Sequence, residues 1–188
     1  NMTTRGLPDE PLDGVHGAIL GRGGSVNDEG SSAAYVEGGY NDFSFHVNGF
    51  VRKADNLSIP GFARSERLRR LSPLPPGEVE ERDELVNTAL EGQGASAGVG
   101  YHWQGGSIAA APSIYLSEYG LPGAPATFID IEQRRFDVTG FLDDPLPGFS
   151  RIKSKLGLVD YEHDEIETTT RGPRIGTRFE NTGYDLRI

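Results

Sequence analysis

The side chains best suited to bind a ligand surround a single histidine near the end of the chain. His163 follows Glu162 and precedes Asp164, Glu165 and Glu167, and an imidazole with carboxylates can bind Zn²⁺ or another divalent cation. The alternative is a solvated acidic loop, which the absence of a fixed ligand spacing favours. The candidate metal ligands are therefore His163, Asp164, Glu165 and Glu167, at the start of an exposed loop.

The remaining histidines and carboxylate pairs do not predict catalysis. His16, His46 and His102 are isolated, and a single strand histidine is more often a hydrogen-bonded structural residue than a ligand. Asp143 and Asp144 stand beside a proline in a turn, and glycine-rich residues 21–24 lack the Lys and Ser/Thr of a phosphate loop. No Ser, His and Asp set has a motif context. We predict no enzyme activity, no catalytic residues and no bound cofactor.

The composition of the 188 residues limits the class of protein. The formal net charge of -10 argues against a nucleic-acid partner, because phosphate binding needs a positive surface. The lack of cysteine excludes disulfides and thiolate metal sites. No apolar run approaches about 18 residues, which excludes a transmembrane helix but not the alternating strands of a β-barrel. The 26 glycines and 12 prolines favour strands and turns over helices.

Alternating apolar and polar residues predict a series of long strands. The clearest run places Phe43, Phe45 and Val47 on one face and Ser44 and His46 on the other. Turn residues separate eight such runs. They are residues 14–24, 31–39, 43–53, 95–103, 107–117, 128–143, 151–163 and 176–188.

The connections between these runs alternate in length. Those after residues 39, 103 and 143 are short, whereas those after 53, 117 and 163 are longer and more polar. In bacterial outer-membrane barrels short turns face the periplasm and long loops face outward, so residues 59–61, 119–123 and 164–174 are expected outside the cell. Within the longest connection, residues 54–94, the spacing of Leu85, Val86, Ala89 and Leu90 leaves a short helix and an irregular loop as open alternatives.

Two details bear on a membrane setting. The apolar positions change face between Ile131 and Phe136, which indicates either a β-bulge or a strand end that projects beyond a bilayer. Aromatic residues near predicted strand ends suit a membrane interface, although packing in a soluble sheet explains them equally well. These residues are Tyr101, Trp103, Tyr115 and Phe149.

Six short sequence motifs are together similar to the pattern of a known protein family. They are DIEQRRFDV at residues 130–138, DPLPGF at 144–149, GLVDYEH at 157–163, EYGLPG at 118–123, IPGF at 59–62 and GTRFENTGY at 176–184. Together they resemble the barrel of TonB-dependent outer-membrane receptors. The resemblance runs with gaps from residue 14 to residue 188, is densest after residue 117, and is nearest to the subgroup that contains zinc-uptake receptors.

The resemblance implies a 22-stranded barrel around an N-terminal plug, which imports siderophores, metal ions, vitamin B12 or sugars with energy from the inner membrane. Residues 1–188 show no plug, no TonB box and no C-terminal aromatic residue. They are therefore expected to be a partial barrel domain without the plug and the remaining strands. Residues 1–10 are polar and do not form a secretory signal, so if the protein belongs in an outer membrane its true start is expected upstream.

We therefore predict an all-β fold: an antiparallel up-and-down meander of about eight strands, part of a transmembrane β-barrel in the bacterial outer membrane. The expected function is that of a receptor segment in active transport. Its ligand would be a metal ion, metal chelate or other small nutrient, and its partners the TonB system and outer-membrane lipid. Exposed strand edges would also invite self-association. The alternative is a soluble β-rich binding or structural module without transport activity.

Overall fold

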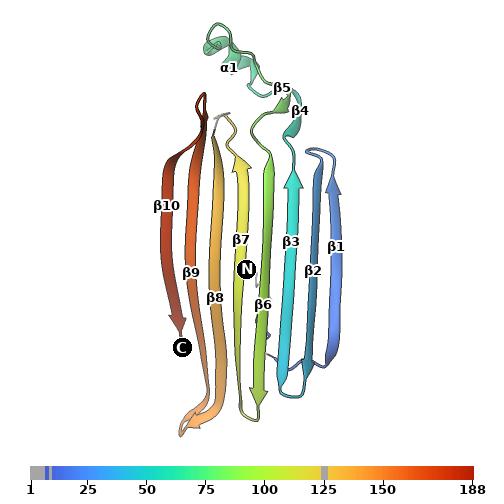
Figure 1. Ribbon diagram of the computed structural model, residues 1–188, viewed down its shortest axis with the longest axis vertical. Helices are drawn as coiled ribbons and strands as arrows, with labels where there is room; N and C mark the ends of the chain where they lie inside the picture. The colour runs from blue at the N-terminus through green and yellow to red at the C-terminus, as the bar shows by residue number, and fades with distance from the viewer. Residues whose placement is uncertain (1–6, 9, 124–126) are drawn as a thin grey trace.

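The computed structural model describes residues 7–8, 10–123 and 127–188. Its main feature is one antiparallel sheet of eight strands arranged in chain order (Figure 1). The strands are β1 (Gly14–Gly24), β2 (Glu29–Tyr40), β3 (Phe43–Ala54), β6 (Leu90–Trp103), β7 (Gly106–Gly120), β8 (Thr127–Leu146), β9 (Phe149–Thr169) and β10 (Gly172–Arg187). The predicted all-β antiparallel meander is confirmed, and each predicted run corresponds to one of these strands.

The connection between β3 and β6 forms a small structure beyond one end of the sheet, at the top of Figure 1. It contains helix α1 (Glu66–Leu71) and a two-stranded sheet of β4 (Leu57–Phe62) and β5 (Arg82–Leu85). The helix begins after Ser65, whose hydroxyl accepts a hydrogen bond from the Leu68 N–H at 3.2 Å. The helix considered at residues 85–90 is wrong, because β5 ends there and β6 begins.

The register of the sheet fixes which side chains share a face. One row of paired residues crosses all eight strands: Val15, Gly38, Phe45, Val99, Ala110, Val138, Leu156 and Leu186. Because side chains alternate along each strand, this row and every second row from it project from one side, which we call the apolar face. The rows between them project from the other side, the polar face.

The change of apolar positions within β8 involves no bulge. From Phe128 to Leu142 the strand pairs with β7 and β9 without a register shift. Ile131 therefore lies on the polar face and Phe136 on the apolar face. Polar residues simply replace apolar ones on the apolar face toward the upper end of the strand.

Burial differs between the two faces. Apart from glycines and Pro8, the buried residues are Ser44, His46, Ala54, His102, Ser107, Ala109, Ala111, Ser117, Ile129 and Thr139. Every one of them projects from the polar face. Among the described residues no large side chain is fully buried, so this part of the chain has no ordinary apolar core.

The ends of the sheet differ from the predicted loops. The connection between β9 and β10 consists of residues 170–171, because β9 continues to Thr169 and β10 begins at Gly172. The predicted outer loop at residues 164–174 is therefore wrong, and these residues extend a hairpin. Within the described residues β1 pairs only with β2 and β10 only with β9, so the sheet is open at both edges.

The turn between β6 and β7 gives a test of the backbone geometry. Gly105 has a φ of +90°, with open space where a Cβ would lie, and Gly30 has the same open space without a positive φ. We expect Gly105→Ala to lower the free energy of unfolding by about 1–2 kcal/mol through backbone strain alone. Gly30→Ala should leave it unchanged or slightly higher. Equal denaturation midpoints for the two variants would contradict the turn geometry.

Candidate functional site

Large apolar side chains gather on the apolar face although that face is open to solvent. Ile19 is 87% exposed, Val99 63% and Val47 50%. Further exposed members are Val15, Val36, Val51, Ile108, Ile114, Phe136, Leu142, Leu158 and Leu186. An apolar surface of this extent on a folded chain marks a region that contacts a partner or a membrane.

Aromatic rings border the apolar face at the end of the sheet that carries the short turns. Tyr40 and Phe43 flank the turn between β2 and β3, and Tyr101 and Trp103 precede the turn between β6 and β7. The ring centroids of Phe43 and Tyr101 are 5.0 Å apart, and those of Tyr101 and Trp103 are 5.6 Å apart. Tyr115 does not belong to this group, because it projects from the polar face.

Charged side chains occupy the apolar face toward its other end. One row of paired residues runs through Lys53, Glu91, Glu118, Asp130, Asp164 and Arg178. An ion pair between Lys53 and Glu91 lies at one end of this charged row. At the other end Arg178 donates from Nε and Nη2 to the Asp164 carboxylate at 2.8 and 2.7 Å. These hydrogen bonds are the main reason that the pKa of Asp164, outside the apolar region, lies below its usual range.

The border between apolar and charged residues forms a step across the sheet. On β7 the first charged residue is Glu118, which shares the row of Lys53 on β3. On β8 it is Arg134, which pairs with Ile114, four residues away from Glu118 on β7. The border is therefore level on β3, β6 and β7, at Lys53, Glu91 and Glu118, and lies four residues lower on β8 and β9, at Arg134 and Asp160.

The polar face encloses a hollow of about 700 Å³ that extends from Leu20 of β1 to Lys155 of β9. Along β2 and β6 the side chains on this face are consistently less exposed than those on the apolar face, which indicates that the sheet curves toward the polar face. Small residues cover this face along β6 and β7. They are Gly92, Gly94, Ser96, Gly98 and Gly100 on β6, and Ser107, Ala109, Ala111 and Ser113 on β7. These small residues leave open space beside the polar face of β6 and β7.

Buried histidines on the polar face are held by hydrogen bonds. His46 Nδ1 lies 3.0 Å from Glu37 Oε2, and its ring stacks on Tyr35 with centroids 5.8 Å apart. His102 Nε2 lies 2.6 Å from Ser44 Oγ. The hydrogen bonds expected of His46 and His102 are therefore present, and His16 likewise contacts the Asp13 carbonyl at 2.8 Å.

The four candidate metal ligands lie in β9 and not in a loop. His163, Glu165 and Glu167 project from the polar face, whereas Asp164 projects from the apolar face and is held by Arg178. His163 stacks on Phe179 with centroids 5.4 Å apart, and its Nδ1 lies 3.1 Å from the Tyr161 hydroxyl. The predicted loop position was wrong because the hairpin pairing continues past these residues. A strand cannot direct all four side chains at one ion.

Sequence reasoning missed the contact between Ser44 and His102, which are separated by 58 residues. It also missed the pair of Arg135 and Asp137, which share two hydrogen bonds of 2.6 and 2.7 Å on the polar face. The available signal was the run of glycines at alternate positions of β6. Such a run marks a strand face that another segment or a ligand approaches closely.

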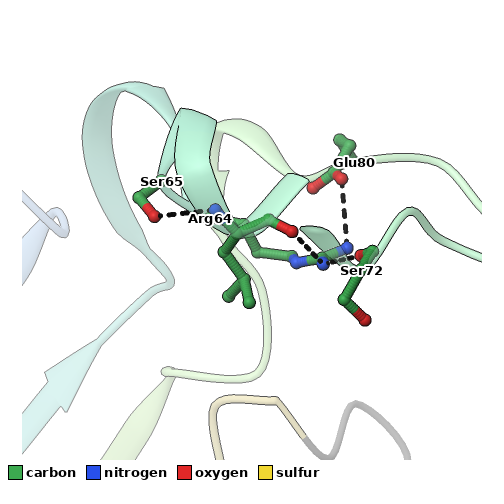
Figure 2. A network of polar contacts seen from close by, with 5 residues as sticks. Arg64, Ser65, Ser72 and Glu80 are labelled. Carbon is green, nitrogen blue, oxygen red and sulfur yellow. Dashed lines mark hydrogen bonds and ion pairs between the residues drawn. The ribbon is translucent and has the colours of Figure 1, made fainter. Parts of the chain in front are cut away.

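Polar contacts hold the insertion between β3 and β6 together (Figure 2). Arg64 donates to Glu80 Oε1 at 3.1 Å, to the Leu68 carbonyl at 3.4 Å and to the Ser72 carbonyl. The Arg69 guanidinium lies 3.8 Å above the centre of the Phe62 ring. The connection expected as a long outer loop is therefore a folded cap at the charged end of the sheet.

Neither a family nor a metal centre identifies the site. No protein-family model matches the chain. In residues 7–8, 10–123 and 127–188, no three His, Asp or Glu side chains are grouped so as to hold a metal ion. The same residues form no helix that is long and apolar enough to cross a membrane. The features that remain for a functional interpretation are the exposed apolar face and the hollowed polar face of the sheet.

The bond between Arg178 and Asp164 predicts a pH effect. A carboxyl whose folded pKa is depressed stabilises the fold above its unfolded pKa, and this contribution is lost as the pH falls through the folded pKa. We expect Arg178→Gln to return the pKa of Asp164 toward its ordinary value of 3.8. The variant should then lose less stability on acidification than the unmodified chain.

Denaturant titrations at neutral and acidic pH measure this effect. Arg174→Gln is the matched control, because the contact of Arg174 with Glu167 in the same hairpin is exposed and long, at 3.6 Å. An Arg178→Gln chain with unchanged acid sensitivity would show that the bond to Asp164 contributes nothing.

Proposed function

We propose that residues 14–188 form part of the wall of a β-barrel in the bacterial outer membrane, with the apolar face toward lipid and the polar face toward the lumen. The barrel would belong to a receptor of the TonB-dependent type, which the sequence motifs resemble. Its ligand would be a metal ion, a metal chelate or another small nutrient. The folded cap of residues 57–85 and the charged row would then lie on the outer side.

The observation that carries this proposal is the reversed distribution of apolar and polar side chains. In a soluble curved sheet the enclosed face is apolar and the solvent face is polar. Here the enclosed face carries Ser44, His46, Ser107 and Thr139, while Ile19 and similar side chains are exposed. A transmembrane barrel needs this arrangement, because its strands alternate between lipid and an aqueous interior.

The dimensions of the apolar region support the same proposal. Residues 43–51 of β3 extend over about 27 Å at 3.3–3.4 Å per residue. At the roughly 35–45° tilt typical of outer-membrane barrels this would correspond to a layer about 19–22 Å thick, close to their apolar band of about 25 Å. The aromatic row at one edge of the band suits a membrane interface.

The alternative is a soluble β-rich binding or structural module. Substitutions at two adjacent residues of β1 distinguish it from a barrel wall. Ile19 and Leu20 are both exposed apolar side chains of β1, on the apolar and the polar face respectively. We expect Ile19→Arg to lower the free energy of unfolding in lipid vesicles by about 2–4 kcal/mol, because it places a charge in the lipid. Leu20→Arg should change it by no more than about 0.5 kcal/mol.

The soluble module gives a different outcome for the same pair. Both side chains would then face water, and both substitutions should change stability by no more than about 0.5 kcal/mol. Vesicle flotation and denaturant titration measure insertion and stability together. Recovery of the unmodified chain in the aqueous phase, folded without detergent, would overturn the membrane proposal.

A further inference from the structure

The segment before β1 lies against the polar face at the end with the short turns. Its described residues are 7, 8 and 10–13, which we call the strap. Leu7 lines the hollow of the polar face, and Pro8 is buried. The Pro8 carbonyl accepts a hydrogen bond from Ser44 Oγ at 3.2 Å. The strap thus reaches from the edge of the sheet at β1 to β3 and β6.

Two glycines leave the space that the strap occupies. A Cβ at Gly39 of β2 would overlap the carbonyl oxygen of Leu12, and a Cβ at Gly100 of β6 would overlap that of Pro8. A Cβ at Gly100 would also lie 2.7 Å from Ser44 Oγ. Any side chain at these positions would push the strap away. The contact therefore depends on main-chain atoms of the strap and on the two glycines of the sheet.

Two linked hydrogen bonds connect the strap to the sheet, from His102 through Ser44 to the Pro8 carbonyl. Ser44 has one hydroxyl proton and donates it to Pro8, so His102 Nε2 must carry the proton that it shares with Ser44 Oγ at 2.6 Å. His102 Nδ1 is buried without a hydrogen-bond partner among the described residues. The His102 backbone N–H donates to the Asp42 carbonyl at 2.7 Å, which holds the main chain of His102 beside the turn between β2 and β3.

We propose that Gly39, Gly100, Ser44 and His102 form a seat that binds the strap through its main chain and closes the short-turn end of the hollow. Release of the strap opens the hollow at that end, while the sheet itself keeps its pairing. The seat recognises an extended segment whose carbonyl groups point toward the sheet. This proposal does not rest on the membrane location of the protein.

Cysteine labelling tests the seat, because the chain has no cysteine of its own. Pro8→Cys places a buried thiol in the strap and keeps its carbonyl, and its reaction rate with a maleimide reports strap release. We expect slow labelling in the single variant. Adding Gly100→Ala or Ser44→Ala should accelerate it about tenfold or more, since each disrupts a buried contact.

Gly92→Ala is the matched control, because Gly92 lies on the same face of β6 and an added Cβ would meet only ordinary contacts at 3.8 Å and beyond. It should leave the labelling rate of the strap thiol unchanged. Thr168→Cys, at an exposed position, gives the rate of an unprotected thiol. Circular dichroism checks that each variant keeps its strand content. If Gly100→Ala does not fold, the test is made with Ser44→Ala, which adds no atoms.

Two outcomes overturn the proposal. One is labelling of the Pro8→Cys chain, without further substitutions, at the rate of the exposed thiol, which would mean that the strap is not held. The other is an equal, slow rate in the Gly92→Ala and Ser44→Ala backgrounds, which would mean that the seat residues do not hold it. Neither result bears on whether Ile19 contacts lipid, so failure of the seat is distinguishable from failure of the barrel wall.

Discussion

Continuous antiparallel pairing is the constraint on which the rest of the structure depends. Eight strands keep one register over most of their length, so a single row links Val15 at one edge to Leu186 at the other. A shift of one residue anywhere would exchange the faces of every strand beyond it. The division into an apolar and a polar face is therefore a property of the whole sheet.

This division leaves the sheet without an internal source of hydrophobic stabilisation. Apart from Ile129, the buried residues among those described are small or polar, as Ser44, Ala109 and Thr139 illustrate, and many large apolar side chains are exposed. In water such a sheet depends on backbone hydrogen bonds, each of which contributes only about 0.5–1.5 kcal/mol net. An apolar surrounding for Ile19, Val99 and their neighbours would supply the missing term and would strengthen the ladder, because unpaired backbone groups are costly away from water.

The sequence predicted the strands well where one face is apolar and poorly where both are polar. The alternation from Phe43 to Val51 fixed both the limits and the faces of β3. Past the apolar band β9 carries charged or polar residues on both sides, as at Glu162, His163 and Asp164, so no period of two distinguishes strand from loop there. That is why the candidate metal ligands were assigned to a loop. The contact of Ser44 with His102 was inaccessible for a different reason, since it depends on a register between distant strands.

The charged row shows how the chain combines an apolar face with a net charge of -10. Glu91, Glu118, Asp130 and Asp164 are successive cross-strand neighbours, and like charges in directly opposed positions destabilise a sheet. Only the two ends of the row are compensated within it, by Lys53 and Arg178. The row lies where water screens such repulsion, whereas the band beside it carries no charge from Phe43 to Val51 on the apolar face of β3. On β3, β6 and β7 its charges therefore mark the limit of the band, and the whole row opposes a displacement of the sheet that would carry it into an apolar phase.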